Sequence, residues 1–290
     1  MASFQAHLVS WIVKRRIKPR LAGERDVNRI RQILKPLPFR VPKDIRVTPA
    51  QLGGIAGEWV ESPQGRAPLL YVHGGGYFAC SPQTHRAITC AFAKLGFRVF
   101  TPAYRLAPEH PFPAAIEDMV CAYETMVDQF GSPFPVAGES AGGGLALAMM
   151  LLLRAKGKEL PRSAALFSPW TDLAGTGDSV QTNHHRCAMF SAPDVAAGAQ
   201  IYLQGADPRN PLASPLYADL SNLPPLLIHV GANEILLDDS VRLAARAQDF
   251  GVPVILKIFP VVSHAWQMAY PHIPEARTSL REAAEFLHAH

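Results

Sequence analysis

Strand-like runs separated by helix-length stretches recur along this chain, and that alternation limits the folds open to it. The runs lie at 44–48, 56–60, 68–73, 97–101, 134–138, 164–168, 226–230 and 254–259. Helical stretches are expected at 113–130, 141–156, 238–250 and 274–288. The later runs are continuously apolar, as in strands covered on both faces. The pattern predicts an α/β fold, with a mostly parallel eight-stranded sheet flanked by helices and an antiparallel pair at the first two strands.

A serine between two glycines stands where the fifth apolar run gives way to a helical stretch, in Gly138-Glu139-Ser140-Ala141-Gly142. Small flanking residues let a tight strand-to-helix turn close, which pushes the serine hydroxyl out beside the helix N-terminus. A protonated alcohol is a poor nucleophile and needs a base within hydrogen-bond reach, oriented by a third group. Ser140 is therefore the candidate nucleophile. The alternative is a serine that only satisfies the start of a helix.

Eleven histidines are candidates for the base. His264 follows the last apolar run by a short loop, where side chains converge at the carboxyl edge of a parallel sheet. His229 lies inside an apolar run and is expected in the core, while His73 is expected to be structural. We assign the base to His264, with His272 as the remaining competitor.

The third group of such a constellation is an acid, and the loop after 226–230 offers two positions for it. Glu234 directly leaves the strand end. Asp238 and Asp239 lie where a helix begins, where an aspartate most often caps the helix or complements its dipole. We predict Glu234 as the acid, with Asp238 as the alternative.

Three glycines in His73-Gly74-Gly75-Gly76 follow the third apolar run. Residues without side chains let backbone N–H groups approach a reacting carbonyl closely. An oxyanion hole made by Gly74, Gly75 and Ala141 is therefore predicted. A phosphate cradle is the alternative, but the chain has neither a Walker lysine nor a dinucleotide-binding glycine pattern.

These motifs occur in order with YRLAPE at 104–109, SPWTDL at 168–173 and NPLASPL at 210–216. Together they resemble the bacterial hormone-sensitive-lipase-like (family IV) carboxylesterases of the α/β-hydrolase superfamily, from about Val60 to the C-terminus. The resemblance implies an α/β-hydrolase fold, the chain order serine, acid, histidine, and no metal or organic cofactor. Relatives usually carry aspartate at the position of Glu234. A subset of them looks similar to this chain and carries glutamate there.

Two segments depart from the strand–helix alternation, the N-terminal residues and the long gap after residue 168. In the first, Phe4, Leu8, Trp11 and Ile12 recur at helical spacing opposite a basic face. A free helix would leave that stripe in water. We therefore expect residues 1–40 and 170–215 to form a helical cap over the site, as the resemblance implies, within a single domain of residues 1–290. The alternative is a helix docked on the body away from the site.

The resemblance implies a serine carboxylesterase that hydrolyses short- to medium-chain esters through an acyl-enzyme. Hydrolysis of lactones or carbamates by the same triad is an alternative. A non-catalytic ligand-binding member, like the plant gibberellin receptors that lack the histidine, is another; the presence of His264 argues against it. Activity is expected to rise with pH through the titration of His264, near about 6.5.

The formal charge of +4 is mild, and much of the excess lies at 14–20. Such a basic run is typical of a solvated helix face, with nucleic-acid or anionic-membrane binding as the alternative. The expected partner is a small-molecule ester, without nucleic acid or stable membrane insertion. A homodimer is a further expectation, from the resemblance alone. No secretory signal is evident, which favours a cytoplasmic protein. The four cysteines lack metal-ligand spacing.

Overall fold

One central β-sheet organises this fold. The computed structural model describes residues 2–36 and 39–290. Eight strands form one sheet in the order β1-β2-β4-β3-β5-β6-β7-β8. The strands are β1 (Arg46–Leu52), β2 (Ile55–Glu61), β3 (Ala67–Val72), β4 (Phe97–Pro102), β5 (Val136–Glu139), β6 (Ala164–Phe167), β7 (Leu226–Gly231) and β8 (Val254–Phe259).

Only β2 runs against its neighbours, pairing antiparallel with β1 and β4, and every other pairing in the sheet is parallel. The predicted mostly parallel eight-stranded sheet, with an antiparallel pair at its start, is confirmed. Because β3 and β5 to β8 are parallel, the loops that follow them meet at the same edge.

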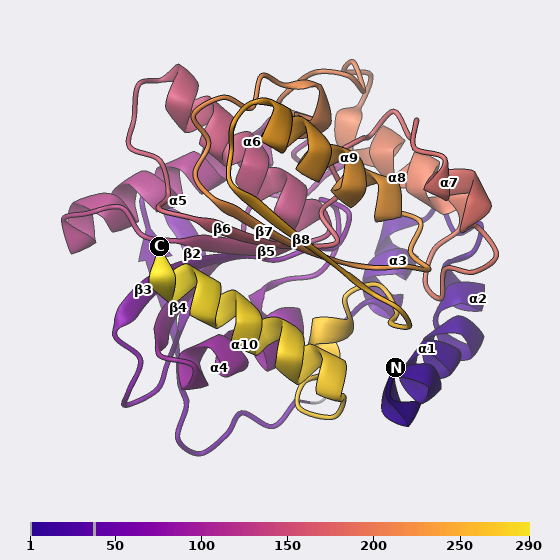
Figure 1. The fold of residues 1–290 in the computed structure, drawn as a ribbon, viewed down its shortest axis with the longest axis horizontal. Helices are drawn as coiled ribbons and strands as arrows, with labels where there is room; N and C mark the ends of the chain where they lie inside the picture. The colour runs from indigo at the N-terminus through magenta and orange to yellow at the C-terminus, as the bar shows by residue number, and fades with distance from the viewer. Residues whose placement is uncertain (1, 37–38) are drawn as a thin grey trace.

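Helices cover both faces of the sheet (Figure 1). On one face lie α4 (Arg86–Lys94) and α10 (Pro274–Ala289), and on the other α5 (Ala114–Phe130), α6 (Ala141–Ala155) and α9 (Leu237–Asp249). Short 3-10 turns occupy Pro82–His85, Pro215–Tyr217 and Trp266–Ala269. Helix α4 was not among the helical stretches expected from the sequence.

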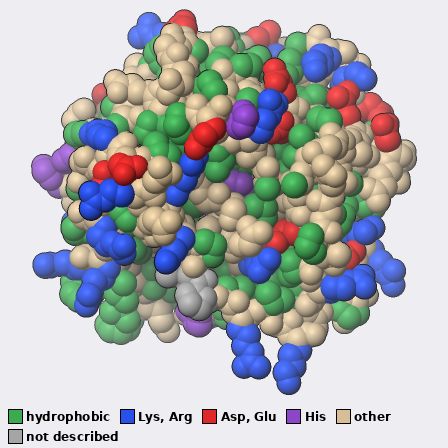
Figure 2. Space-filling view, turned by 180° about the vertical axis from the view of Figure 1, so that it is seen from behind, with side chains coloured by type: hydrophobic (Ala, Val, Ile, Leu, Met, Phe, Trp, Pro, Cys, Tyr) green, Lys and Arg blue, Asp and Glu red, His purple; other side chains and the backbone are tan. Residues whose placement is uncertain are grey.

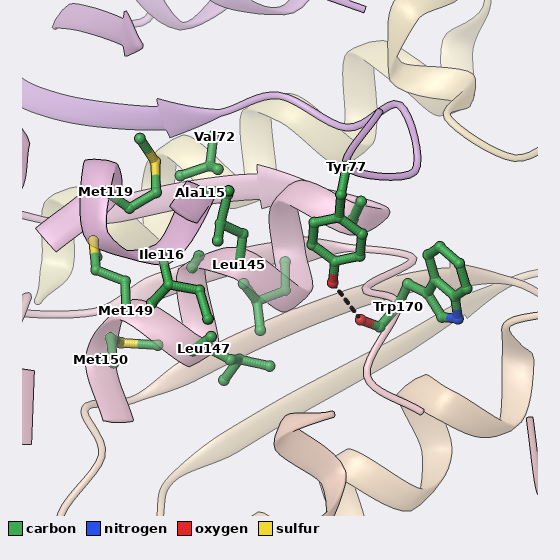
Figure 3. Close-up of a cluster of buried hydrophobic side chains, with 14 of the residues drawn as sticks. Val72, Tyr77, Ala115, Ile116, Met119, Leu145, Leu147, Met149, Met150 and Trp170 are labelled. Carbon is green, nitrogen blue, oxygen red and sulfur yellow. Dashed lines mark hydrogen bonds between the residues drawn. The ribbon is translucent and has the colours of Figure 1, made fainter. Parts of the chain in front are cut away.

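Alternate strand residues supply two separate cores. Leu70 and Val72 of β3 join the core under α5, α6 and α9, whereas Leu69 and Tyr71 join the one under α4 and α10. Figure 3 shows the first of these cores, in which leucines and methionines of α6 lie beside Ile116 and Met119 of α5. Burial of apolar area at about 25 cal/mol per Å² makes these two layers the main stabilisation of the fold.

Two helical segments lie beyond the carboxyl edge of the strands. The N-terminal one contains α1 (Phe4–Arg16), α2 (Lys18–Leu21) and α3 (Val27–Ile33), and the other contains α7 (Ser179–Thr182) and α8 (Ala192–Leu203). Lys14 and Lys18 donate from Nζ to the carbonyl oxygens of His185 and His184, each at 2.8 Å. The two segments therefore contact each other, as Figure 1 shows at its right-hand side.

The N-terminal stripe does not pack as its periodicity suggested. Phe4, Leu8, Trp11 and Ile12 are all exposed, and α1 instead turns Ala6 and Val9 toward the protein. The expectation that this stripe is covered is thus wrong. The reason is that α1 has apolar residues on two faces, and periodicity alone does not tell which one is buried.

Candidate active site

Ser140 lies at the turn between β5 and α6, in a backbone conformation fixed by its neighbours. Its φ of 54° lies in the left-handed region, which costs a non-glycine residue about 1–3 kcal/mol. The Ser140 amide donates to the carbonyl oxygen of Phe167 at 2.8 Å, and its carbonyl accepts from the Trp170 amide at 2.9 Å. These bonds to the end of β6 and the segment after it hold Oγ beside the N-terminus of α6.

The close approach of α6 to β3 requires the glycine that follows this turn. A Cβ atom on Gly142 would lie 2.2 Å from the carbonyl oxygen of Val72. Only a residue without a side chain lets the first turn of α6 pack so tightly against the strand end. The glycine after the serine is thus explained by the fold itself.

The His264 ring is held by Glu234, which reaches it from the loop after β7. Nδ1 of His264 lies 2.6 Å from Oε2 of Glu234, and both side chains are almost completely buried. A carboxylate only accepts hydrogen bonds, so Nδ1 carries the proton and Nε2 presents its lone pair. Nε2 has no hydrogen-bond partner in the part of the chain that the structure describes. His264 and Ser140 line the same cavity, which leaves Nε2 as the ring nitrogen able to take a proton there.

Glu234 is in turn held by two further donors. Its Oε1 accepts from Ser168 Oγ at 2.7 Å and from the Gly231 amide at 2.7 Å. The alternative acid, Asp238, accepts instead from the amide of Ser179 in α7 at 2.8 Å. The structure therefore brings Glu234 to His264 and places Asp238 in a contact with the second helical segment.

The surroundings of His264 raise its pKa. Burial of the ring disfavours the imidazolium and lowers the pKa, but the charge and hydrogen bond of Glu234 raise it. The buried carboxylate of Glu139 adds to this effect, and the net pKa lies above the usual value of 6.5. Protonation of this ring during a reaction is accordingly stabilised by two carboxylates.

The Gly74 amide is not free to act as the oxyanion donor that was expected from the sequence. It donates to Oε1 of Glu139 at 2.9 Å, so it is not available to a developing oxyanion, and that assignment is corrected. The amides of Gly75, Gly76 and Ala141 make no hydrogen bond within residues 2–36 and 39–290. Gly75 and Gly76 also line the cavity. Gly75 has a φ of +113°, and a Cβ there would lie 2.2 Å from the carbonyl oxygen of Ala79, so this turn needs glycine.

Glu139 and His85 form a buried pair behind the glycine turn. Oε1 of Glu139 lies 2.8 Å from Nε2 of His85, and the two side chains are 3% and 1% exposed. Burial raises the pKa of Glu139, but the bonds from His85 and Gly74 and the nearby histidine charges lower it below its usual value. The carboxylate thus anchors the turn that begins at Gly74.

The other histidines considered as bases lie elsewhere. His73 is buried, stacks on Tyr104 at 4.3 Å between ring centroids, and has Nδ1 2.8 Å from the Gly74 carbonyl oxygen. Burial lowers the pKa of His73 to about 3. His229 is buried beside Ser279, and its Nδ1 lies 2.9 Å from Oγ of Ser279. His272 is exposed and does not line the cavity.

The cavity that contains Ser140 and His264 is small and mostly apolar. It has a volume of about 150 Å³. Residues of both helical segments form its wall together with the glycine turn, among them Leu21, Ile30, Leu34, Phe78, Trp170, Met189, Phe190, Val195, Gly198 and Ile201. Such a wall suits an apolar group attached to a reacting centre at Ser140.

Within residues 2–36 and 39–290, no group of three or more metal-binding side chains is found. The four cysteines Cys80, Cys90, Cys121 and Cys187 are free thiols. Among the described helices, none has the length and apolar character required to cross a bilayer.

Two polar residues of this site were missed in the sequence. Ser168 opens the SPWTDL stretch, which contributed only to the resemblance, and it is 66 residues away from Glu234 in the chain. His85 is 54 residues away from Glu139 and belongs to no motif. The position of Ser168 at a strand end was a usable signal, whereas nothing in the sequence marks His85.

Comparisons with known proteins agree with this architecture. A family described as the alpha/beta hydrolase fold matches residues 69–268. An acetyl-hydrolase from Streptomyces hygroscopicus is 43% identical over 81% of this chain and 80% of its own length. An esterase from Acinetobacter venetianus is 35% identical over 89% of this chain and 88% of its own.

Solved structures are similar over nearly the whole chain. The crystal structure of EstE5 soaked with ethyl alcohol has a TM-score of 0.95, with 38% identity over 99% of both chains. An esterase from the bacterial hormone-sensitive lipase family has a TM-score of 0.91, with 37% identity over 100% of this chain and 99% of its own.

Proposed function

The chain belongs to the alpha/beta hydrolase fold family and is a carboxylesterase of the bacterial hormone-sensitive-lipase type, and we propose that Ser140, His264 and Glu234 carry out its reaction. Ser140 Oγ attacks the ester carbonyl carbon while His264 Nε2 takes the hydroxyl proton. The tetrahedral intermediate collapses as His264 returns that proton to the departing alkoxide. Water, activated by the same nitrogen, then cleaves the acyl-enzyme and releases the carboxylic acid.

One observation carries this assignment. The buried Nε2 of His264 has no partner among the described residues, while Nδ1 is bound to Glu234 at 2.6 Å. Leaving a buried polar atom unpaired costs free energy, and here the unpaired atom is the basic ring nitrogen of a histidine that lines the same cavity as Ser140. In this cavity the proton donor that would use it is Ser140.

The negative charge on the intermediate needs donors, and we assign them to the amides of Gly75, Gly76 and Ala141. They are unpaired among the described residues, and Ala141 begins α6, whose dipole favours an anion. Each such donor is typically worth about 2.7–4 kcal/mol of transition-state stabilisation. Glu139 keeps the turn in place by binding Gly74.

The cavity and the relatives support a proposal for the substrate class. A dry cavity of about this volume holds a molecule the size of benzene. The similar acetyl-hydrolase acts, by its name, on acetyl groups. We propose short- to medium-chain acyl esters as substrates, with residues 2–36, 39–40 and 170–215 as the cap that limits the acyl length. Residues 1, 37 and 38 of the expected cap lie outside the described residues.

We expect kcat/KM on p-nitrophenyl esters to fall about tenfold or more from butyrate to laurate, because a long acyl chain overfills the cavity. Leu34 is part of the cavity wall formed by the N-terminal segment. Leu34→Ala enlarges the cavity there and should shift the preference toward octanoate. A preference for laurate in the parent, or an unchanged profile in Leu34→Ala, contradicts the proposed cap.

The pH dependence reports on His264. Only the neutral ring accepts a proton, so kcat/KM falls as the pH drops through the pKa of His264. Because that pKa is raised, the midpoint of the acid limb is expected above the ordinary value of about 6.5 rather than at it. A profile of kcat/KM from about pH 5 to pH 9 on a non-ionising ester measures this midpoint. A flat profile, or a midpoint below about 6.5, contradicts the assignment.

A further inference from the structure

Helix α1 shows apolar side chains on the side that faces away from the protein. Its inner side packs Ala6 and Val9 against the body. On its outer side Phe4 is 77% exposed, Leu8 44%, Trp11 57% and Ile12 42%. These four residues, called the α1 apolar face below, make up half of the eight large hydrophobic side chains found exposed among the described residues.

The same region is strongly basic. Residues 1–20 contain five basic residues and no Asp or Glu, namely Lys14, Arg15, Arg16, Lys18 and Arg20. The formal charge of this stretch therefore exceeds the +4 charge of the whole chain. Arg15, Arg16 and Arg20 are exposed and form no salt bridge within the described ranges. Figure 2 shows hydrophobic and basic side chains next to each other at its lower left, the edge where α1 lies.

The helix that carries this surface is fixed in place. Ser3 donates from its amide and from Oγ to the carboxylate of Glu275, at 2.6 and 2.8 Å. At the other end, Lys14 and Lys18 bind carbonyl oxygens of the second helical segment. A partner that binds the α1 apolar face therefore meets an ordered surface and does not have to fold it.

We propose that the α1 apolar face docks on the surface of an anionic lipid bilayer. Large aromatic and aliphatic side chains flanked by lysine and arginine are the composition of helices that lie in a membrane interface. The cations would face acidic headgroups, while Phe4 and Trp11 enter the boundary with the acyl chains.

Charge argues against a second copy of this chain as the occupant. A symmetric contact through α1 would bring two sets of five cations together, and residues 1–20 of neither copy would supply an acidic residue. Anionic lipid offsets that charge instead. Leu21 of the neighbouring α2 lines the cavity, so docking would hold the wall of the cavity beside the bilayer, where apolar esters concentrate.

Flotation with lipid vesicles tests this inference without any need for turnover. The full chain is mixed with vesicles of phosphatidylcholine alone or of phosphatidylcholine with phosphatidylglycerol. We expect binding to the anionic vesicles, weakened at least about tenfold by Phe4→Ser/Trp11→Ser and by Arg15→Glu/Arg16→Glu. The matched control Ile255→Ser/Ile258→Ser removes two exposed apolar side chains from β8 and should bind like the parent.

Tryptophan emission gives a second readout. Trp59, Trp170 and Trp266 are buried, whereas Trp11 is exposed, so a blue shift on addition of anionic vesicles reports on Trp11. Unchanged hydrolysis of a soluble short-chain ester shows that the variants are folded. The proposal is overturned if the parent does not float with anionic vesicles at low ionic strength, or if Phe4→Ser/Trp11→Ser binds them equally. It is also overturned if that variant instead abolishes a dimer of the parent, because a second copy would then be the occupant.

Discussion

Ser140→Ala is expected to lower kcat for a short-chain p-nitrophenyl ester by about a million-fold, the loss found when a serine hydrolase loses its nucleophile. The methyl group cannot attack the carbonyl carbon, so no acyl-enzyme forms. The oxyanion donors and the cavity remain, and a small residual rate above that in water should persist. Steady-state kinetics, with circular dichroism as a check on folding, measure the effect.

Ser163→Ala is a matched control for that substitution. Ser163 is fully buried, and its Oγ has no hydrogen-bond partner in the described part of the chain. It lies just before β6, at the opposite end of that strand from the site. Its loss should leave kcat within a small factor of the parent. A Ser140→Ala enzyme with more than about one per cent of parental activity contradicts the assignment.

Glu234→Gln is expected to lower kcat by about ten-thousand-fold, as replacement of the buried acid by its amide does in serine proteases. The neutral amide no longer stabilises the imidazolium, and its NH₂ group can present a donor to Nδ1 and favour the wrong tautomer. Because the charge of Glu234 raises the pKa of His264, the acid limb of any remaining activity should also move to lower pH.

Asp238→Asn separates the two acid candidates. Asp238 accepts a hydrogen bond from the Ser179 amide, which the carbonyl oxygen of an asparagine can still accept. This variant should therefore keep nearly the parental kcat. If Asp238→Asn loses activity and Glu234→Gln does not, the acid role passes to Asp238.

The strands from β3 to β7 were predictable because the parallel sheet buries both of their faces and so leaves continuous apolar runs in the sequence. All eight predicted runs overlap observed strands, although the ends differ. The fifth strand begins at Val136 rather than at 134. Pro135 has no amide hydrogen to donate to a neighbouring strand, which accounts for the later start.

The sequence predicted the site residues that stand in motifs at strand ends, but not the contacts those residues make with distant parts of the chain. Ser140, Glu234 and His264 each follow a strand that ends at the same edge, so topology alone suggested that they meet. The role of Gly74 was not visible, because the residue that captures its amide, Glu139, is 65 residues away in the chain. For the same reason the sequence did not show that Ser168 holds the acid.

The N-terminal helix shows a different limit of sequence analysis. Its periodicity correctly indicated a helix, but two apolar faces compete for burial, and the smaller side chains of Ala6 and Val9 turned inward. Contacts at the helix ends, through Ser3 to Glu275 and from Lys14 and Lys18 to the second segment, fix that choice. None of these partners is close to α1 in the sequence.

The central claim is that His264, held by Glu234, makes the Ser140 hydroxyl reactive. Its most direct test is labelling with a p-nitrophenyl phosphate triester, followed by peptide mapping in the mass spectrometer. We expect one phosphoryl adduct per chain, on the peptide that contains Ser140, with complete loss of activity and with labelling in His264→Ala slowed by several orders of magnitude. An adduct on another residue, full activity after labelling, or equally fast labelling of His264→Ala would contradict the account.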